Sequence, residues 1–401
     1  RSSDLHILYV GNEELHSEVK TSLSQISSLH LAPNIQPLME TTRLFPAQQE
    51  LGGIYTEVKK KRGSGVSQLL SWSDGEFSST ASAYGRVIRF LSKKYGDDKG
   101  VLGVDIGSQH TILSAAFDGE ETLKVFPSLG LGEGSTGILE HSSLPEITRW
   151  LTLAIPDRKV QDYLYQKSIY PHTIPAEKEE WAIEQALARQ ALRIAVKDSI
   201  PEFPAHTRLS RPSDFPLVEP IIGSGQVLTG APSRAHSTLM LLDGIQPSGV
   251  TTLALDQNGL LPALGAASKI NQLLTVQVIE SSTFLNLGTV IAPLGYARPG
   301  TPILRMQIQR EDGRRTTRDI KFGTLIVLPT HQGEKVTLHL RPLRGFDVGM
   351  GGPGKSGRVS AVGGALGIII DARGRPLRFS PDPARNQKRN RNWLKILQKY
   401  Q

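Results

Sequence analysis

The residues best suited to chemistry in this sequence lie around Asp105. An apolar run ends on Asp105, a Gly107-Ser108 turn follows, and a second apolar run begins near Thr111. Backbone N–H groups in a tight Gly-Ser turn can form an anion-binding nest for phosphate. A carboxylate at a strand end can hold Mg²⁺ directly or through water. These residues therefore predict a phosphate-binding hairpin, although an ordinary hairpin turn would use the same residue types.

A second candidate for phosphate binding is the stretch GMGGPGKS at residues 349–356, which matches the P-loop pattern in full. A P-loop requires a helix directly after it, because the amide groups and dipole of the helix N-terminus hold the phosphates. The residues that follow here are rich in glycine and lead to Ile368-Ile369-Ile370, which favours a strand. We therefore interpret this stretch as a glycine loop between β-strands.

The elements that must position the hairpin follow an α/β pattern over residues 1–268. Apolar runs bounded by turn residues predict strands, and one-sided apolar stripes predict helices. The hairpin region, residues 100–126, is predicted as three strands joined by two turns, whereas residues 30–78 show no regular pattern. Further strands are expected at 5–10, 221–225 and 253–256, and helices at 13–23, 79–94, 143–155, 176–197 and 234–242.

The pattern changes after residue 268. Short strand-like runs separated by glycine, proline and charged turns predict an all-β barrel or sandwich module. The expected domains are a first segment at 1–99, an α/β lobe at 100–268, the β module at 269–372 and a basic segment at 373–401 with a short helix at 393–400. The runs taken as strands are 273–279, 285–293, 303–310, 317–322, 324–328 and 335–340.

The net charge of +8 is concentrated at one end of the 401-residue chain. Residues 373–401 hold nine basic side chains and one acidic one, so the remainder is neutral overall. Arginines and a tryptophan there could bind nucleic acid. The alternative, which we favour, is that arginines of the stretch 371–377 pair with carboxylates of the protein body.

Several function classes are excluded or disfavoured by composition. The chain has no cysteine, which excludes disulfides, thiolate metal sites and a cysteine nucleophile and fits a cytoplasmic protein. Its ten histidines are scattered, so a metal held only by protein side chains is not expected. No apolar run reaches the length of a membrane span and no secretory leader is found. Because the chain begins at Arg1, we expect it to be part of a longer protein.

Motifs along the chain resemble two related groups of proteins. Residues 103–111 resemble a phosphate loop of the actin, sugar kinase and heat-shock ATPase superfamily, and residues 221–225, IIGSG, resemble its later adenosine-contacting motif. Most of the chain, from about Leu5 to Trp393, resembles the MutL family associated with glutamate mutase, which is distinct from the mismatch-repair protein of similar name. The motifs that carry this resemblance are at 11–12, 34–37, 242–247, 261–265 and 370–377.

The resemblance implies an actin-like, ribonuclease-H-like α/β ATPase fold and a chaperone-like factor that reactivates an adenosylcobalamin-dependent mutase by ATP-driven release of damaged cofactor. The expected cofactors are ATP and Mg²⁺, and the expected partner is the mutase. Asp105 would be the catalytic residue and the metal ligand. Phosphate would be held by Gly107, Ser108, Gln109 and Thr111, and the nucleoside by Gly223, Ser224 and Gly225.

One departure from the superfamily pattern leaves alternatives open. Its members carry two Asp-x-Gly phosphate loops, one in each lobe, whereas a single such loop following an apolar strand is found here, at 105–107. Residues 1–99 would then be the remnant of the first lobe with connecting helices. ATPase activity of this chain is therefore uncertain, and a non-catalytic binding or assembly module with a degenerate nucleotide site is the main alternative. A small-molecule hydrolase or kinase also stays open, although no set of catalytic residues for it can be read from the sequence. Homo-oligomerisation stays open as well. Neither a nucleic-acid nor a membrane partner is expected.

Overall fold

The computed structural model describes residues 5–25, 27–38, 44–62, 65–72, 78–95, 99–204, 207, 215–281, 283–343 and 345–400. The chain forms two compact units, Arg1–Ala83 and Tyr84–Gln401, which are described separately. None of the described helices combines the length and the apolar composition needed to cross a lipid bilayer.

The first unit is built on a small parallel sheet. Strands β1 (His6–Tyr9) and β2 (Ser28–Leu31) pair in parallel and are connected through η2 (Glu13–Leu15) and α1 (His16–Leu23). The strand expected at 5–10 and the helix expected at 13–23 are thereby confirmed. The irregular interpretation of residues 30–78 is wrong, because this stretch holds the end of β2, α2 (Phe45–Arg62) and α3 (Val66–Trp72). Helix α2 exposes most of its described side chains and buries Ile54. A helix with so small a buried face needs no apolar stripe, so its sequence lacks the one-sided periodicity that would predict it.

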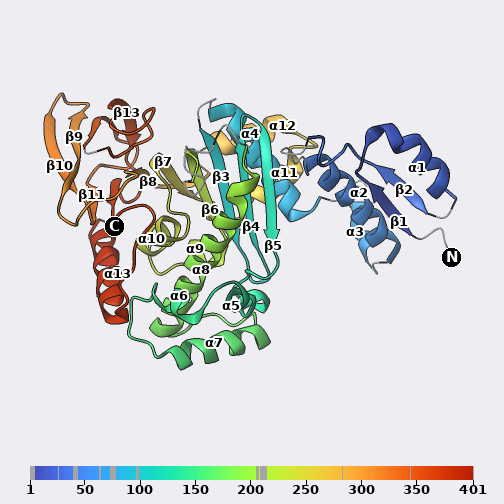
Figure 1. Ribbon diagram of the computed structural model, residues 1–401, viewed down its shortest axis with the longest axis horizontal. Helices are drawn as coiled ribbons and strands as arrows, with labels where there is room; N and C mark the ends of the chain where they lie inside the picture. Colours follow the sequence, from blue (N-terminus) through green and yellow to red (C-terminus); the bar gives the residue numbers. More distant parts are fainter. Residues whose placement is uncertain are drawn as a thin grey trace. The chain divides into compact units, whose positions relative to one another are not determined.

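The second unit is organised around an eight-stranded mixed sheet with the order β11-β14-β8-β7-β6-β3-β4-β5 (Figure 1). The predicted three-stranded hairpin region is confirmed as an antiparallel meander, β3-β4-β5. On its other side, β3 pairs in parallel with β6, and β6 pairs in parallel with β7. The bounds are β3 (Gly100–Ile106), β4 (Thr111–Phe117), β5 (Glu120–Phe126), β6 (Val218–Ser224), β7 (Gly249–Leu255), β8 (Leu285–Ala292), β11 (Thr324–Leu328) and β14 (Ile368–Ala372).

Helices cover both faces of this sheet. Gly103 of β3 lies beneath Tyr84 and Ile88 of α4 (Thr80–Tyr95), where an added Cβ would come within 2.6 Å of either side chain. Leu102 and Val104 instead belong to the main hydrophobic cluster together with α8 (Lys178–Ser199) and α10 (Arg234–Gly244). The alternation of side chains along β3 therefore separates α4 from α8, as expected for a buried strand.

The remaining helices of the second unit include several that the sequence pattern placed incorrectly. The helix expected at 143–155 begins with a capping box formed by Ser143 and Glu146, but it ends at Thr148. The run 273–279, expected as a strand, is helical, because the Asn271 side chain accepts the Leu274 N–H and caps it. The helices are η3 (Glu133–Ser135), α5 (Gly137–His141), α6 (Leu144–Thr148), α7 (Asp157–Ile169), η4 (Ile200–Glu202), α9 (Gln226–Thr229), α11 (Leu260–Ala267), α12 (Gln272–Glu280) and α13 (Pro383–Gln398).

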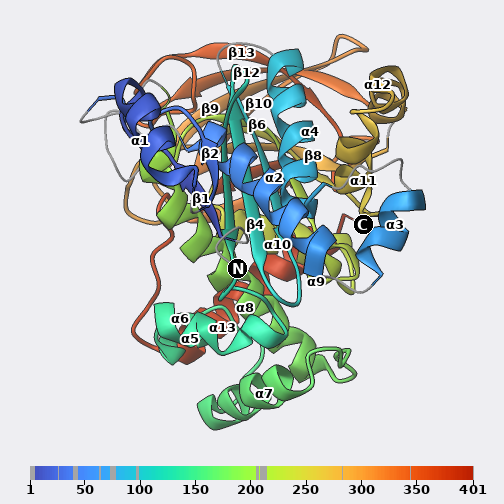
Figure 2. The same ribbon diagram turned by 90° about the vertical axis from the view of Figure 1, so that its right-hand side faces the viewer.

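The strands after residue 280 divide between two sheets. Strands β9 (Pro302–Arg310), β10 (Arg315–Lys321), β12 (Lys335–Pro342) and β13 (Gly357–Val362) form an open antiparallel sheet, at the end of the unit away from α7 (Figures 1 and 2). Strands β8, β11 and β14 belong to the large sheet. Residues 349–356 connect β12 to β13 without a following helix, which confirms that they are not a P-loop.

Candidate functional site

The hairpin turn lies at an edge where three parallel strands end. Asp105 pairs in register with Ser224 across β3 and β6, and Asp256 directly follows β7. Because β3, β6 and β7 are parallel, their carboxyl ends meet at the same edge of the sheet. The structure therefore brings together the two predicted segments, 105–111 and 223–225. It also adds Asp256, which the sequence analysis did not single out because nothing local marks it.

The tip of the turn offers two backbone donors. The Gly107 N–H donates to the His110 carbonyl at 3.0 Å and closes the turn, so it is not available to a ligand. The N–H groups of Ser108 and Gln109 find no acceptor among the described residues, and both residues are exposed. Two adjacent free amides on a tight turn form the kind of concavity that holds an anion.

A glycine-rich segment supports the turn from behind. Leu131 and Gly132 donate their N–H groups to the carbonyls of Gly107 and Ser108, at 3.0 and 2.7 Å. An added Cβ on Gly132 would lie 1.9 Å from Ser108 Oγ, and one on Gly130 would lie 2.3 Å from the Ser108 carbonyl oxygen. Backbone can approach the turn this closely only because these residues lack a side chain.

Asp105 is a partly desolvated carboxylate. Burial raises its pKa, Asp256 raises it further, and the nearby Ser224 hydroxyl and His110 offset part of this effect. The two Asp256 oxygens accept the N–H groups of Leu260 and Leu261 at 2.9 and 2.8 Å, at the start of α11. A cation at Asp105 would relieve the unfavourable desolvation of its charged form. The carboxylate therefore suits a magnesium ligand.

The hydroxyl groups of the predicted site have structural contacts. Thr111 is fully buried, and its Oγ1 donates to the Leu129 carbonyl at 2.8 Å. Ser224 Oγ lies 3.2 Å from both the Tyr84 hydroxyl and the Val104 carbonyl oxygen. Burial and then Asp105 raise the pKa of Tyr84, which keeps its phenol protonated. These contacts fix the turn and the end of β6 in place.

The other predicted residues lie at the surface of the turn and at the end of β6. Gln109 Nε2 donates to Glu133 Oε2 at 3.1 Å, which connects the turn to η3. Gly225 has a φ of +97°, and an added Cβ there would lie 2.2 Å from the Ile106 carbonyl oxygen. The chain leaving β6 is thus pressed against the end of β3, directly beside the turn.

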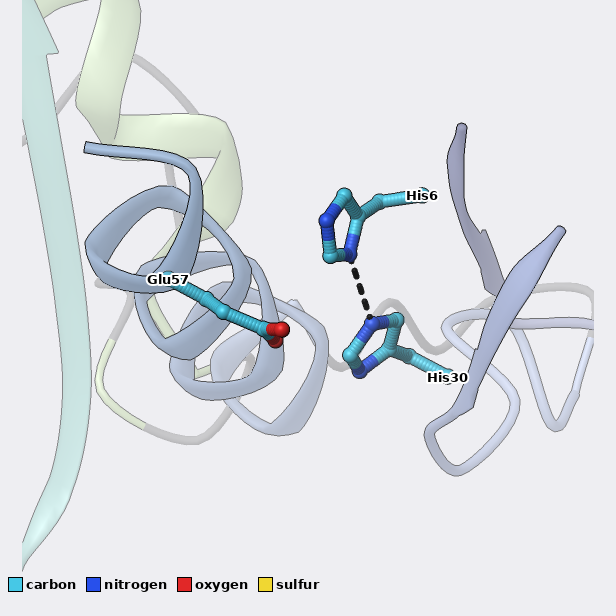
Figure 3. A group of neighbouring side chains, drawn as sticks. All are labelled: His6, His30 and Glu57. Carbon is cyan, nitrogen blue, oxygen red and sulfur yellow. Dashed lines mark hydrogen bonds between the residues drawn. The ribbon is translucent and has the colours of Figure 1, made fainter. Parts of the chain in front are cut away.

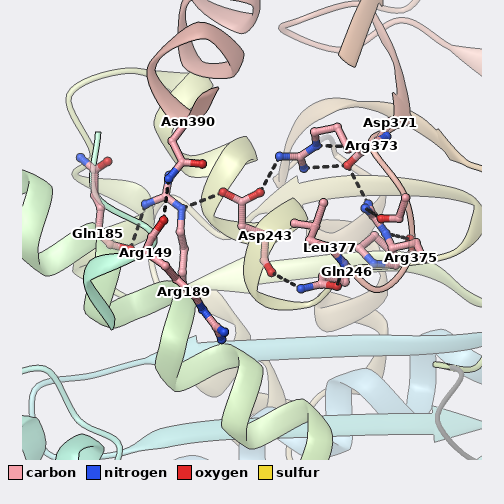
Figure 4. Close-up of polar contacts among 12 residues, drawn as sticks. Arg149, Gln185, Arg189, Asp243, Gln246, Asp371, Arg373, Arg375, Leu377 and Asn390 are labelled. Carbon is pink, nitrogen blue, oxygen red and sulfur yellow. Dashed lines mark hydrogen bonds and ion pairs between the residues drawn. The ribbon is translucent and has the colours of Figure 1, made fainter. Parts of the chain in front are cut away.

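The motifs at 242–247 and 370–377 form a buried charge network (Figure 4). Asp243 accepts hydrogen bonds from Arg189 Nε at 2.9 Å and from Arg373 Nη1 at 2.7 Å. Asp371 in turn accepts from Arg373 Nη2 at 2.7 Å and from Arg375 Nη2 at 2.6 Å. Burial would raise the pKa of Asp371, but the two guanidinium groups outweigh it and hold that pKa far below its ordinary value.

The network gives the two motifs a structural role away from the turn. The Arg373 guanidinium also stacks 4.5 Å from the Trp393 ring centroid, so the network joins α8, α10, β14 and α13. The expectation that the arginines following Asp371 pair with carboxylates of the body is confirmed. Arg373 and Arg375 are buried and are not available to a nucleic acid.

A cavity of about 500 Å³ lies between β11 and α13. Its apolar part is formed by Leu325, Ile326, Trp393 and Ile396, and its cationic part by the side chains of Arg385, Lys388 and Arg389. None of the three cations forms an ion pair within the described part of the chain. The cavity is separate from the residues predicted for nucleotide binding.

Comparison with known proteins identifies the family. The family model described as MutL protein matches residues 2–283, which include the hairpin turn, β6 and β7. A search of curated proteins gives no match. Because the family model covers well over half of the sequence, the chain belongs to the MutL family.

Proposed function

We propose that this chain is an ATP-dependent, chaperone-like reactivating factor for an adenosylcobalamin-dependent mutase, with an actin-like α/β lobe that binds Mg-ATP at the β3–β4 turn. The observation that carries the proposal is the pair of free amides at Ser108 and Gln109, in the turn that directly follows the partly desolvated Asp105 at the end of β3. Membership of the MutL family and the meander that continues into parallel β6 and β7 support the same assignment.

Each residue has a definite task in this proposal. Asp105 holds Mg²⁺ directly or through water, and the turn amides of Ser108 and Gln109 hold a phosphate oxygen. Gly225 lets the end of β6 approach β3 closely. In this proposal, residues 223–225 contact the nucleoside. Ser224 joins the end of β6 to β3 through its hydrogen bond to the Val104 carbonyl, and Thr111 fastens the turn to Leu129 through its own buried hydrogen bond. ATP supplies the free energy for the reactivation of the partner.

Titration calorimetry with Mg-ATP tests the nucleotide site. We expect the unmodified chain to bind and Asp105→Asn to lose measurable binding, because the neutral amide lacks the negative charge that attracts the cation. Asp118→Asn is the matched control, since Asp118 is an exposed aspartate in the next turn with a φ of +47°, a conformation that asparagine tolerates well. Equal binding by the chain and both variants would place the nucleotide elsewhere.

A second measurement tests the mutase role. An adenosylcobalamin-dependent mutase inactivated by turnover is incubated with this chain and either ATP or a non-hydrolysable analogue. The expected result is that mutase activity recovers with the chain and ATP but not with the chain and the non-hydrolysable analogue. Recovery with neither nucleotide, while Mg-ATP binding persists, would separate the ATP site from the proposed partner.

A non-catalytic assembly role is the second candidate, and the cavity between β11 and α13 favours it. Three cations beside an apolar surface suit an acidic, partly apolar segment of a protein partner. Under this alternative, Arg385→Glu combined with Lys388→Glu abolishes co-purification of the mutase, whereas Asp105→Asn leaves it intact. The opposite pattern supports the ATPase proposal.

A further inference from the structure

Two histidines and a glutamate meet in the first unit. His6 on β1 and His30 on β2 lie on neighbouring parallel strands, where the register pairs His6 with Ser28 and Leu8 with His30. The His6 Nδ1 and His30 Nε2 atoms are 3.1 Å apart, and the two rings stack with centroids 5.3 Å apart. Glu57 extends from α2 toward both rings (Figure 3). One ligand atom from each residue lies within 4.8 Å of the others.

We propose that His6, His30 and Glu57 bind a divalent transition metal, with Zn²⁺ as the best fit. Two imidazoles and one carboxylate with an open fourth position are a ligand set that zinc adopts in proteins. In tetrahedral coordination with Zn–N bonds of about 2.0–2.1 Å, two nitrogen ligands lie roughly 3.3–3.4 Å apart. The observed 3.1 Å between His6 and His30 needs only a small adjustment to reach this spacing. Imidazole ligands disfavour Mg²⁺ and Ca²⁺.

The small core of the first unit gives the metal a structural task. Its buried apolar side chains among the described residues are Ala32, Ile54, Leu70 and Ala83. A unit that buries so little apolar surface commonly relies on an added constraint such as a metal ion. The three ligands come from β1, β2 and α2, so one ion would connect the three main elements of this unit.

The groups around the cluster allow the metal to enter. Glu57 forms an ion pair with Lys61 at 3.3 Å, but both side chains are about half exposed. An exposed pair of this kind contributes little stability, so it competes weakly with a metal. The hydrogen bond between His6 and His30 explains their contact without a metal, which makes metal titration the deciding measurement. The sequence did not reveal the cluster because its members are separated by 24 and 27 residues.

The test is a titration of the full chain with ZnCl₂, in which isothermal calorimetry measures the binding. We expect one zinc per chain and at least a tenfold loss of affinity in His6→Ala, His30→Ala and Glu57→Gln, because removal of even an outer-shell partner weakens metal sites by about 10–100-fold. Glu50→Gln, on the same helix, and His16→Ala, in the same unit, are the matched controls and should bind as the unmodified chain does.

Two further measurements guard against variants that fail to fold. Glu57→Gln keeps the size of an exposed side chain, so its loss of affinity cannot come from unfolding. Co²⁺ bound in place of Zn²⁺ should give visible absorption bands that change in each ligand variant. Hydrogen exchange should slow on metal addition within residues 5–62 but not within residues 99–204. Absence of stoichiometric binding, or equal binding by all variants, would overturn the proposal.

Discussion

At the scale of single residues, Asp105 is a position where binding and stability oppose each other. Its folded-state pKa lies above its ordinary value, mainly because of burial, so the folded chain holds this proton more tightly than the unfolded chain does. The stability contributed by this group is present below the unfolded-state pKa and is lost as the pH rises through the folded-state pKa. Charging Asp105 therefore destabilises the fold at neutral pH.

We predict that Asp105→Asn raises the Tm at pH 7 while it removes Mg-ATP binding. The amide has no charge to desolvate, so the difference in Tm between variant and unmodified chain should shrink as the pH is lowered from 7 to 4. Thermal unfolding at a series of pH values measures this difference, with Asp118→Asn as the control that should follow the unmodified chain. A lower Tm for Asp105→Asn at neutral pH would contradict the prediction.

At the scale of elements, the junction between β6 and α9 depends on Gly225. Its φ of +97° is unfavourable for other residues, and an added Cβ would also lie 2.2 Å from a backbone oxygen of β3. Gly259 has a φ of +63° but an added Cβ there would meet nothing within 4 Å. The two glycines separate the effect of backbone strain from the effect of a steric clash.

We predict that Gly225→Ala destabilises the protein clearly more than Gly259→Ala does. The Gly259 substitution should lower the free energy of unfolding by about 1–2 kcal/mol, the usual cost of a left-handed residue. The Gly225 substitution adds a backbone clash that only movement of β3 against β6 can relieve. Urea unfolding of both variants measures the difference, and equal destabilisation would show that the two strands separate easily.

The elements differ in how well their sequences predict them. The meander β3-β4-β5 was predicted because its turns contain Gly107 and Asp118-Gly119 between apolar runs. The helix α12 was missed because its β-branched residues resemble a strand and its cap is a single side chain, Asn271. Local patterns thus gave the strands that contain the hairpin, but not the helices whose formation depends on caps and tertiary contacts.

At the scale of the whole molecule, partners distant in sequence complete both the core and the candidate site. The position of Asp256 at the same sheet edge as Asp105 follows from the parallel order of β3, β6 and β7, which no local pattern encodes. The expected β module likewise divides between two sheets because β14 inserts between β11 and β8. Sequence motifs located the hairpin and residues 223–225, whereas the strand order that joins them required the structure.

The charge network at Asp243 joins four elements, and its disruption should affect the whole second unit. Asp243→Ala leaves Arg189 and Arg373 buried without this carboxylate, so we predict a loss of about 3–5 kcal/mol in the free energy of unfolding. Asp319→Ala is the control, because Asp319 pairs with Arg305 on an exposed surface and should cost about 0–1 kcal/mol. Denaturant unfolding compares the two, and similar losses would show that the buried network adds no stability.

The insertion of β14 between β11 and β8 also constrains the order in which the protein can be completed during synthesis. Strand β8 pairs with β14 along one edge, but residues 293–367 must be made before β14 emerges. At the usual rate of about 5–20 residues per second, this interval lasts roughly 4–15 s. The apolar strand β8 then presents an unpaired edge, and such an edge can join a strand of another nascent chain. Ribosomes spaced closely on one messenger would therefore favour aggregation, whereas widely spaced ribosomes and rapid elongation would favour a correctly completed sheet.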